Sequence, residues 1–239
     1  MRVDIWSDIV CPWCYIGKRR FDVALETLDQ RDQIEVVHHS FELDPTIERG
    51  QTTQLLDMLA AKYRLNPAQA SEAEQRVATQ AAADGLGYTS DRPVGNTFDA
   101  HRLVHLATER GRGEETLQRL YEAHFSEGRS VFDTDALTAV AAEAGLDQAE
   151  ARRVLADGGY ADEVRADEEQ AGALGISGVP FFVLDRKYGI SGAQPAALIA
   201  EALQEAWRRA EAEAEPEPAQ PGAGPAGGLT GGRPDPAAS

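Results

Sequence analysis

The chain contains two cysteines, Cys11 and Cys14, which lie three residues apart in the stretch IWSDIVCPWCYIGKRR. Pro12 follows Cys11 at what we expect to be the first turn of a helix, where a missing N–H costs no hydrogen bond. Cys11 then lies at the helix end that carries free N–H groups and positive potential, which stabilises a thiolate. Cys14, one turn inside, is shielded. This spacing favours Cys11 as an attacking thiol and Cys14 as the resolving thiol.

Other uses of these side chains are open. A CxxC pair can supply half of a zinc site, but no second CxxC or well-spaced Cys/His pair accompanies this one. Two free cysteines can also be small buried hydrophobic residues. His101 and His105 have metal-binding spacing on a predicted helix, yet the sequence offers no third ligand beside them. We therefore expect no metal and no organic cofactor.

Charge and composition restrict the cellular compartments and the partners that we expect for this protein. The net charge is −17, from 40 acidic and 23 basic residues, which makes nucleic acid and anionic membrane surfaces poor partners. The sequence begins MRVDIWSD, without a secretory apolar region, and no run approaches the roughly 18 to 20 apolar residues that span a bilayer. We expect a cytoplasmic protein. Thiols there are mostly kept reduced, which favours transient or catalytic use of the cysteines.

The residues around the cysteines predict a strand, a helix and a second strand. VDIW at 3–6 reads as a short strand with Trp6 in the core, and apolar residues then recur at helical spacing to about residue 30. QIEVVHHSFEL at 33–43 is rich in β-branched and aromatic residues, and of His38 and His39 we expect one side chain to face inward and the other outward. This order predicts a βαβ unit with parallel strands.

The rest of the chain divides into three parts. From about 52 to 174 the pattern is helical almost throughout, and PFFVLDRKYGISG then reads as a hairpin followed by an amphipathic closing helix. The segment 211–239 is rich in Glu, Pro and Gly and predicts a disordered acidic tail. We therefore expect a main domain from 1–45 plus 175–208, with an α-helical subdomain inserted at 46–174.

A proline at the start of a predicted strand forms the second motif. In GISGVPFFVL, Pro180 cannot donate to a sheet and is tolerated only at such an entry position. In the cis form it would lay the Val179 backbone beside the thiols, as a short edge able to pair with an extended peptide. A trans proline that merely begins a strand is the alternative.

Together these motifs resemble a known family. CPWC after a first strand, a helical insertion, GVPFF, a hairpin and a final helix resemble the DsbA-like form of the thioredoxin fold. More closely, SDIVCPWCYIGKRRF, FELDP, AHRL, AHFSEGR and GISGVPFFV resemble the FrnE-like branch of cytoplasmic DsbA-family oxidoreductases. The resemblance implies an α/β fold, a thioredoxin fold with a large α-helical insertion. It also implies Cys11 as nucleophile, Cys14 as resolving thiol and Pro180 as the cis-proline opposite them.

The same resemblance extends the predicted site. Pro12, Trp13 and Val179 are expected to contact the substrate beside the thiols. Because the corresponding regions of the family help to wall the active-site cleft, Asn96 and His101 in GNTFDAHRLVH are further candidates for substrate contact. Helix capping and packing are the alternative roles for these two residues.

The sequence thus predicts a thiol–disulfide oxidoreductase or isomerase. Its substrates would be protein or small-molecule disulfides, and a low-molecular-weight thiol or a thioredoxin-type reductant could reset the pair. Trp13 lies where DsbA has histidine, so we expect a reduction potential below the −120 mV of DsbA and nearer about −200 to −230 mV. Two alternatives stay open: a glutathione-dependent enzyme like the kappa transferases and hydroxychromene-carboxylate isomerases, and a non-catalytic, chaperone-like peptide-binding module.

Overall fold

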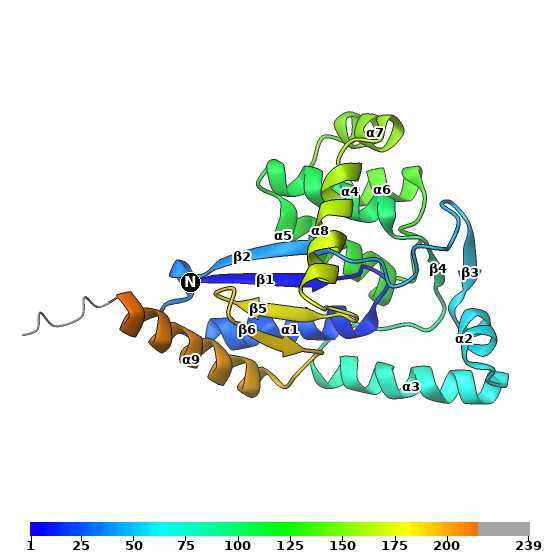
Figure 1. Cartoon of the computed structure of the whole chain (residues 1–239). Coiled ribbons are helices and arrows are strands. Elements are labelled where there is room, and N and C mark those ends of the chain that lie inside the picture. Colours follow the sequence, from blue (N-terminus) through cyan, green and yellow to red (C-terminus); the bar gives the residue numbers. More distant parts are fainter. Residues whose placement is uncertain (215–239) are drawn as a thin grey trace, which may run out of the picture.

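A four-stranded sheet in the order β2-β1-β5-β6 forms the centre of the computed structural model, which describes residues 1–214 (Figure 1). Strand β1 (Arg2–Ser7) pairs in parallel with β2 (Glu35–Ser40). On its other side β1 pairs antiparallel with β5 (Phe181–Leu184), which forms a hairpin with β6 (Tyr188–Ser191). The predicted parallel βαβ unit and the predicted hairpin are both confirmed.

Helices cover both faces of this sheet. Side chains alternate along β1, so Val3 and Ile5 pack against α1 (Pro12–Glu26) and α9 (Ala196–Ala214) in one apolar cluster. Trp6 points to the other face, where it packs near Ala171 of helix α8 (Ala161–Ala173). Trp6 is 1% exposed, which confirms its predicted core position. One of the two covering layers therefore comes from the helical insertion.

The inserted region begins with a short two-stranded sheet. Strand β3 (Thr52–Gln54) pairs antiparallel with β4 (Pro93–Gly95). The prediction of a helix from residue 52 is therefore wrong for these first residues, because two β-branched threonines favour an extended backbone and β4 supplies a partner. The helices that follow lie beside the main sheet in Figure 1. They are α2 (Leu55–Tyr63), α3 (Pro67–Ala83), α4 (Phe98–Glu109), α5 (Gly113–Tyr121), α6 (Thr134–Glu143) and α7 (Gln148–Asp157), with a π-helical turn at Glu122–Ser126. In the main domain, a 3₁₀ turn at Arg31–Gln33 lies between α1 and β2.

Two element ends differ from the sequence prediction. Helix α1 ends at Glu26 rather than near residue 30. The Thr27 hydroxyl donates to the Ala24 carbonyl at 2.7 Å, which gives a hydrogen-bond donor to a carbonyl that has no partner within the helix. Helix α9 runs to Ala214, so residues 211–214 are helical and do not belong to the predicted tail. The remaining tail prediction, 215–239, lies outside the described residues.

The two histidines of β2 lie on opposite faces of the strand, but neither is simply outward. His39 Nε2 lies 2.8 Å from Asp4, and His38 Nε2 lies 2.8 Å from Glu114. The side chains are 9% and 13% exposed respectively. Neither side chain faces solvent, because the insertion brings Glu114 of α5 to His38 and Asp167 of α8 to His39.

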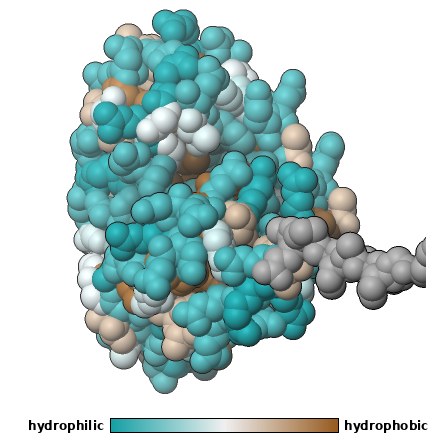
Figure 2. Space-filling model, turned by 90° about the vertical axis from the view of Figure 1, so that its left-hand side faces the viewer, coloured by the Kyte–Doolittle hydropathy of each residue, from teal (hydrophilic) through white to brown (hydrophobic). Residues whose placement is uncertain are grey.

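The surface agrees with the acidic composition. Figure 2 shows one face on which hydrophilic residues predominate and apolar residues appear as separate spots and recesses between them. Within residues 1–214, no helix is both long enough and apolar enough to cross a membrane.

Candidate dithiol active site

Cys11 lies at the N-terminus of α1, beside the loop that precedes β5. It is the N-cap residue, with an extended backbone, and Pro12 occupies the first helical turn. Its carbonyl accepts hydrogen bonds from the N–H groups of Cys14 and Tyr15, at 3.0 and 3.3 Å. The Cys11 Sγ lies 3.6 Å from the Val179 carbonyl oxygen. The sulfur therefore lies at the positive end of the helix dipole, where negative charge is stabilised.

Cys14 is the more deeply covered thiol. It is 1% exposed, against 4% for Cys11, and both thiols are free. Its Sγ accepts a hydrogen bond from the Asp8 N–H at 3.4 Å. Burial, together with the neighbouring Cys11, raises the pKa of the Cys14 thiol well above its ordinary value. The two sulfurs thus occupy different surroundings, one at a cleft and one beneath it.

Pro180 faces α1 across the thiols. The Val179–Pro180 peptide bond is cis, which answers the question that the sequence left open. Pro180 immediately precedes β5, and its ring packs on Gly17 of α1, where a built Cβ would lie 2.8 Å from Pro180 Cγ. A glycine at this position allows the helix and the proline loop to approach closely. That approach sets the Val179 carbonyl beside Cys11.

An apolar cleft of about 410 Å³ opens in front of Cys11. Four of the predicted site residues line it: Cys11, Pro12, Trp13 and Val179. The opposite wall comes from Leu43 and Asp44, just before the inserted region, and from residues of the insertion itself, and the sequence indicated none of these lining residues as site residues. Its large apolar side chains are Leu43, Ile47, Leu55, Met58, Leu59, Tyr63, Val77 and Val94. The structure therefore brings the dithiol and the first helices of the insertion together in one site.

Asn96 and His101 lie behind this cleft, not on its wall. The Asn96 amide donates to Glu42 at 2.9 Å, and its oxygen accepts from the Phe98 N–H at 3.0 Å, at the start of α4. His101 is 3% exposed, and its Nε2 lies 3.4 Å from the Asp8 carboxylate. These contacts agree with capping and packing. The direct substrate contact expected for the two residues finds no support in this geometry.

Asp8 is a site residue that the sequence reasoning missed. It is fully buried, lies three residues before Cys11 and lines the cleft. Its carboxylate accepts from the Leu43 N–H at 2.7 Å and approaches His101, while its backbone carbonyl accepts from the Cys11 N–H at 3.2 Å. A buried carboxylate just before the cysteines was the available signal, because such a group needs partners. Asp8 ties the dithiol turn to Leu43 on the opposite wall and to His101 behind the cleft.

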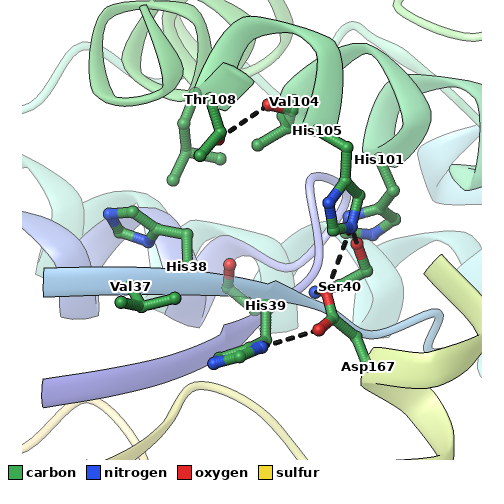
Figure 3. Close-up of a pocket in the computed structure, with 11 residues that line it drawn as sticks. Val37, His38, His39, Ser40, His101, Val104, His105, Thr108 and Asp167 are labelled. Carbon is green, nitrogen blue, oxygen red and sulfur yellow. Dashed lines mark hydrogen bonds and ion pairs between the residues drawn. The ribbon is translucent and has the colours of Figure 1, made fainter. Parts of the chain in front are cut away.

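A second pocket, of about 150 Å³, lies between β2 and α4 (Figure 3). His105 of α4, Ser40 of β2 and Asp167 of α8 converge there, with His105 Nε2 at 3.0 Å from Ser40 Oγ and 3.1 Å from Asp167 Oδ2. His101 and His105 have different carboxylate partners. Across the part of the chain that the structure describes, no cluster of three or more Cys, His, Asp or Glu side chains is arranged to hold a metal.

His39 links two carboxylates at the edge of this pocket. Its Nδ1 lies 2.6 Å from Asp167 and its Nε2 lies 2.8 Å from Asp4, and only the doubly protonated ring donates to both. Burial would lower the pKa of His39, but the hydrogen bonds to Asp167 and Asp4 outweigh it and raise that pKa. Burial would likewise raise the pKa of Asp167, yet its bonds to His105, His39 and the Ser40 N–H lower it strongly. This network joins β1, β2, α4 and α8.

Comparison with known proteins agrees with this arrangement. The model of the DSBA-like thioredoxin domain matches residues 2–204, which is most of the chain. The chain belongs to the DsbA-like thioredoxin-domain family. A solved structure of a probable DsbA oxidoreductase from Streptomyces coelicolor is 52% identical, covers 97% of both chains and superposes with a TM-score of 0.84. The predicted fold class, a DsbA-like thioredoxin fold with a helical insertion, is confirmed.

Two more distant structures share the DsbA-like fold. A cytosolic disulfide reductase, DsbM from Pseudomonas aeruginosa with glutathione, is 18% identical over 89% of this chain and 98% of its own, with a TM-score of 0.59. A 2-hydroxychromene-2-carboxylate isomerase is 15% identical over 90% of this chain and 100% of its own, with a TM-score of 0.64. At these identities the likeness establishes the fold alone.

Proposed function

We propose that this DsbA-like protein is a thiol–disulfide oxidoreductase that exchanges disulfides through Cys11 and Cys14. The observation that carries the proposal is the asymmetry of the two sulfurs. Cys11 lies at a helix N-terminus on the wall of the cleft, whereas Cys14 lies beneath it with a raised thiol pKa. Disulfide exchange needs one accessible nucleophile and one protected thiol that acts second.

The proposed reaction has two exchange steps. The Cys11 thiolate attacks one sulfur of the substrate disulfide, so that a Cys11–substrate disulfide forms and the other substrate sulfur leaves as a thiolate. Cys14 then loses its proton and attacks the Cys11 sulfur, which releases the second substrate thiolate and leaves an oxidised Cys11–Cys14 pair. Two electrons pass to the substrate. Run in reverse, the same steps oxidise a substrate dithiol, and both directions together allow isomerisation.

Partners and compartment follow from this chemistry. The substrates are protein or small-molecule disulfides, and a low-molecular-weight thiol or a thioredoxin-type protein returns the pair to the reduced state. The cytoplasm, where such thiols are abundant, is the proposed compartment. The FrnE-like branch, indicated by the sequence motifs, is the proposed subgroup.

The alternative of a glutathione-dependent transferase or isomerase is weaker. A serine at the position of Cys11 would serve that chemistry, whereas this chain has a second thiol that such a reaction does not need. A non-catalytic peptide-binding module would explain the apolar cleft, but it gives no role to a reduced dithiol at a helix N-terminus.

Trapping tests the proposal. In Cys14→Ala the mixed disulfide cannot resolve, so we expect mass spectrometry under non-reducing conditions to find a substrate or small thiol attached to Cys11. Cys11→Ser is the matched control and should carry no adduct. If Cys14→Ala carries no adduct after incubation with disulfides, or if Cys11→Ser keeps full activity in an insulin-reduction assay, the proposal fails.

A further inference from the structure

We propose that the cleft selects disulfide-bonded peptides whose residues beside the cystine are apolar and uncharged, and that it discriminates against glutathione. This inference rests on the proposed disulfide exchange and adds the substrate class. It assigns the selection to α2, a helix of the insertion that faces the dithiol across the cleft.

The apolar wall is built by one face of α2. Leu55, Met58, Leu59 and Tyr63 recur at helical spacing and all line the cleft. Leu55 is buried, whereas Met58 and Leu59 are only half-buried and Tyr63 is 60% exposed. The apolar face of α2 is thus incompletely covered by the protein itself. A bound apolar group would remove that surface from water, which is favourable.

The rim of the cleft is also apolar. Trp13 is 41% exposed and Leu43 is 43% exposed, and with Tyr63 they lie around the same opening. Within residues 1–214 five large hydrophobic side chains are exposed, and these three share one site. Such grouping marks a binding surface, whereas scattered exposed residues need no explanation.

The charges at the cleft are already paired. Among the described residues that line it, the two cations are Lys62, with Nζ 3.4 Å from Asp44, and Arg92, with its guanidinium 2.9 Å from Glu74. Arg92 is 1% exposed, so it cannot turn toward a ligand. Asp8 adds a buried acidic group. Glutathione carries carboxylates that need unpaired donors, and a chain with a net charge of −17 repels an anionic ligand.

The backbone beside Cys11 favours a peptide as the occupant. The Val179 carbonyl lies 3.6 Å from Cys11 Sγ and just ahead of β5, so it is placed to accept a main-chain N–H next to the substrate cysteine. Cys11 itself is 4% exposed. A thin, flexible segment reaches it through the cleft, while a disulfide inside a folded protein does not.

Three disulfides test the selection. The first is the symmetrical disulfide of an acetylated and amidated Leu-Cys-Leu peptide, the second is the same peptide with Glu in place of Leu, and the third is oxidised glutathione. Reduced protein is mixed with each, and the second-order rate of Cys11–Cys14 oxidation is followed by acid quenching, alkylation and mass spectrometry. We expect the leucine peptide to react about tenfold faster than the other two disulfides, because a single apolar contact changes a rate by a factor of this size.

Two substitutions on α2 form a matched pair. Leu59 lines the cleft, whereas Leu56, which is also half-buried on the same helix, does not. We expect Leu59→Gln to slow the leucine peptide about tenfold and leave glutathione unchanged, and Leu56→Gln to leave both rates within about twofold. Met58→Arg adds an unpaired cation and should slow the peptide but speed glutathione. Tyr63→Ser, at an exposed position, repeats the first test if Leu59→Gln unfolds.

The outcomes separate the two proposals. If glutathione reacts as fast as the leucine peptide, or if Leu59→Gln and Leu56→Gln lose the same activity, the substrate class is refuted while disulfide exchange stands. If none of the three disulfides oxidises the protein, disulfide exchange is refuted and the substrate class with it.

Discussion

Replacing Gly17 with alanine tests how the cis-proline loop is held against the dithiol helix. A Cβ at this position would lie 2.8 Å from Pro180 Cγ and 3.5 Å from Ala193 Cβ. The first distance is shorter than real Cβ contacts allow, so α1 and the Pro180 loop must separate. We predict that Gly17→Ala both destabilises the protein and slows its reaction with disulfides.

The size of the effect follows from two opposing contributions. Alanine in place of a helical glycine stabilises by up to about 1 kcal/mol. Overpacking a tight contact costs about 1–3 kcal/mol, and Pro180 is a rigid ring that cannot rotate away. The net result is a loss of about 1 kcal/mol, which lowers the melting temperature of a domain of this size by about 2–4 °C.

Thermal unfolding by circular dichroism and the rate of insulin reduction measure the two effects. The matched control is Gly172→Ala in α8, where a Cβ meets no atom within 4 Å, so helix propensity alone acts and the protein should be slightly stabilised. The exchange rate of Gly17→Ala should fall even at temperatures where it is fully folded, because the Val179 carbonyl moves away from Cys11. If Gly17→Ala is as stable and as active as Gly172→Ala, the assignment of this contact is wrong.

Two further predictions concern charge. The pKa of His39 is raised above its ordinary 6.5, so its contribution to stability is complete below pH 6.5 and is lost as the pH rises through the folded-state pKa. The pKa values of Asp4 and Asp167 are lowered, so their contribution to stability is lost only in acid, as the pH falls through their folded-state pKa values. Urea unfolding should therefore show the stability gap between wild type and His39→Gln narrowing from pH 6 to pH 9, and a constant gap would contradict the bridging imidazolium. Trp13 is 41% exposed, so Trp13→His should leave the core intact while an imidazolium stabilises the reduced thiolate. The reduction potential should rise by about 30 mV or more from a wild-type value of about −200 to −230 mV. Equilibration in glutathione redox buffers measures this potential, and the absence of a rise would refute the role assigned to Trp13.

Local patterns were sufficient for the segments that hold the thiols. A short apolar run identified β1, β-branched and aromatic residues identified β2, Pro12 marked the start of α1, and Pro180 marked the entry to β5. Each of these signals depends on a few neighbouring residues. The chemistry of the cysteines could therefore be predicted before any tertiary contact was known.

The opposite wall of the cleft could not be predicted in this way. Leu59 belongs to a helix whose apolar face looks like any core-facing stripe, and only the tertiary structure reveals that the cleft lies against it. Strand β3 was missed because its two threonines are a weak local signal and its partner β4 lies about forty residues away. The sequence predicted that Asn96 and His101 contact the substrate because their segment lies near the cleft. The directions of their side chains, which depend on tertiary packing, point them away from the cleft wall.

Helix α8 has a consequence for how the protein folds. It covers one face of the central sheet, next to Trp6, and holds β2 through Asp167. A shortened chain without residues 46–174 would expose that face of the sheet to water. It would also lack Asp167, so His39 would keep only Asp4 as a carboxylate partner. We therefore expect that the shortened chain is not an independently stable thioredoxin domain. Loss of the insertion and loss of the sheet should accordingly be a single cooperative transition, with the dithiol surviving only while both parts are folded.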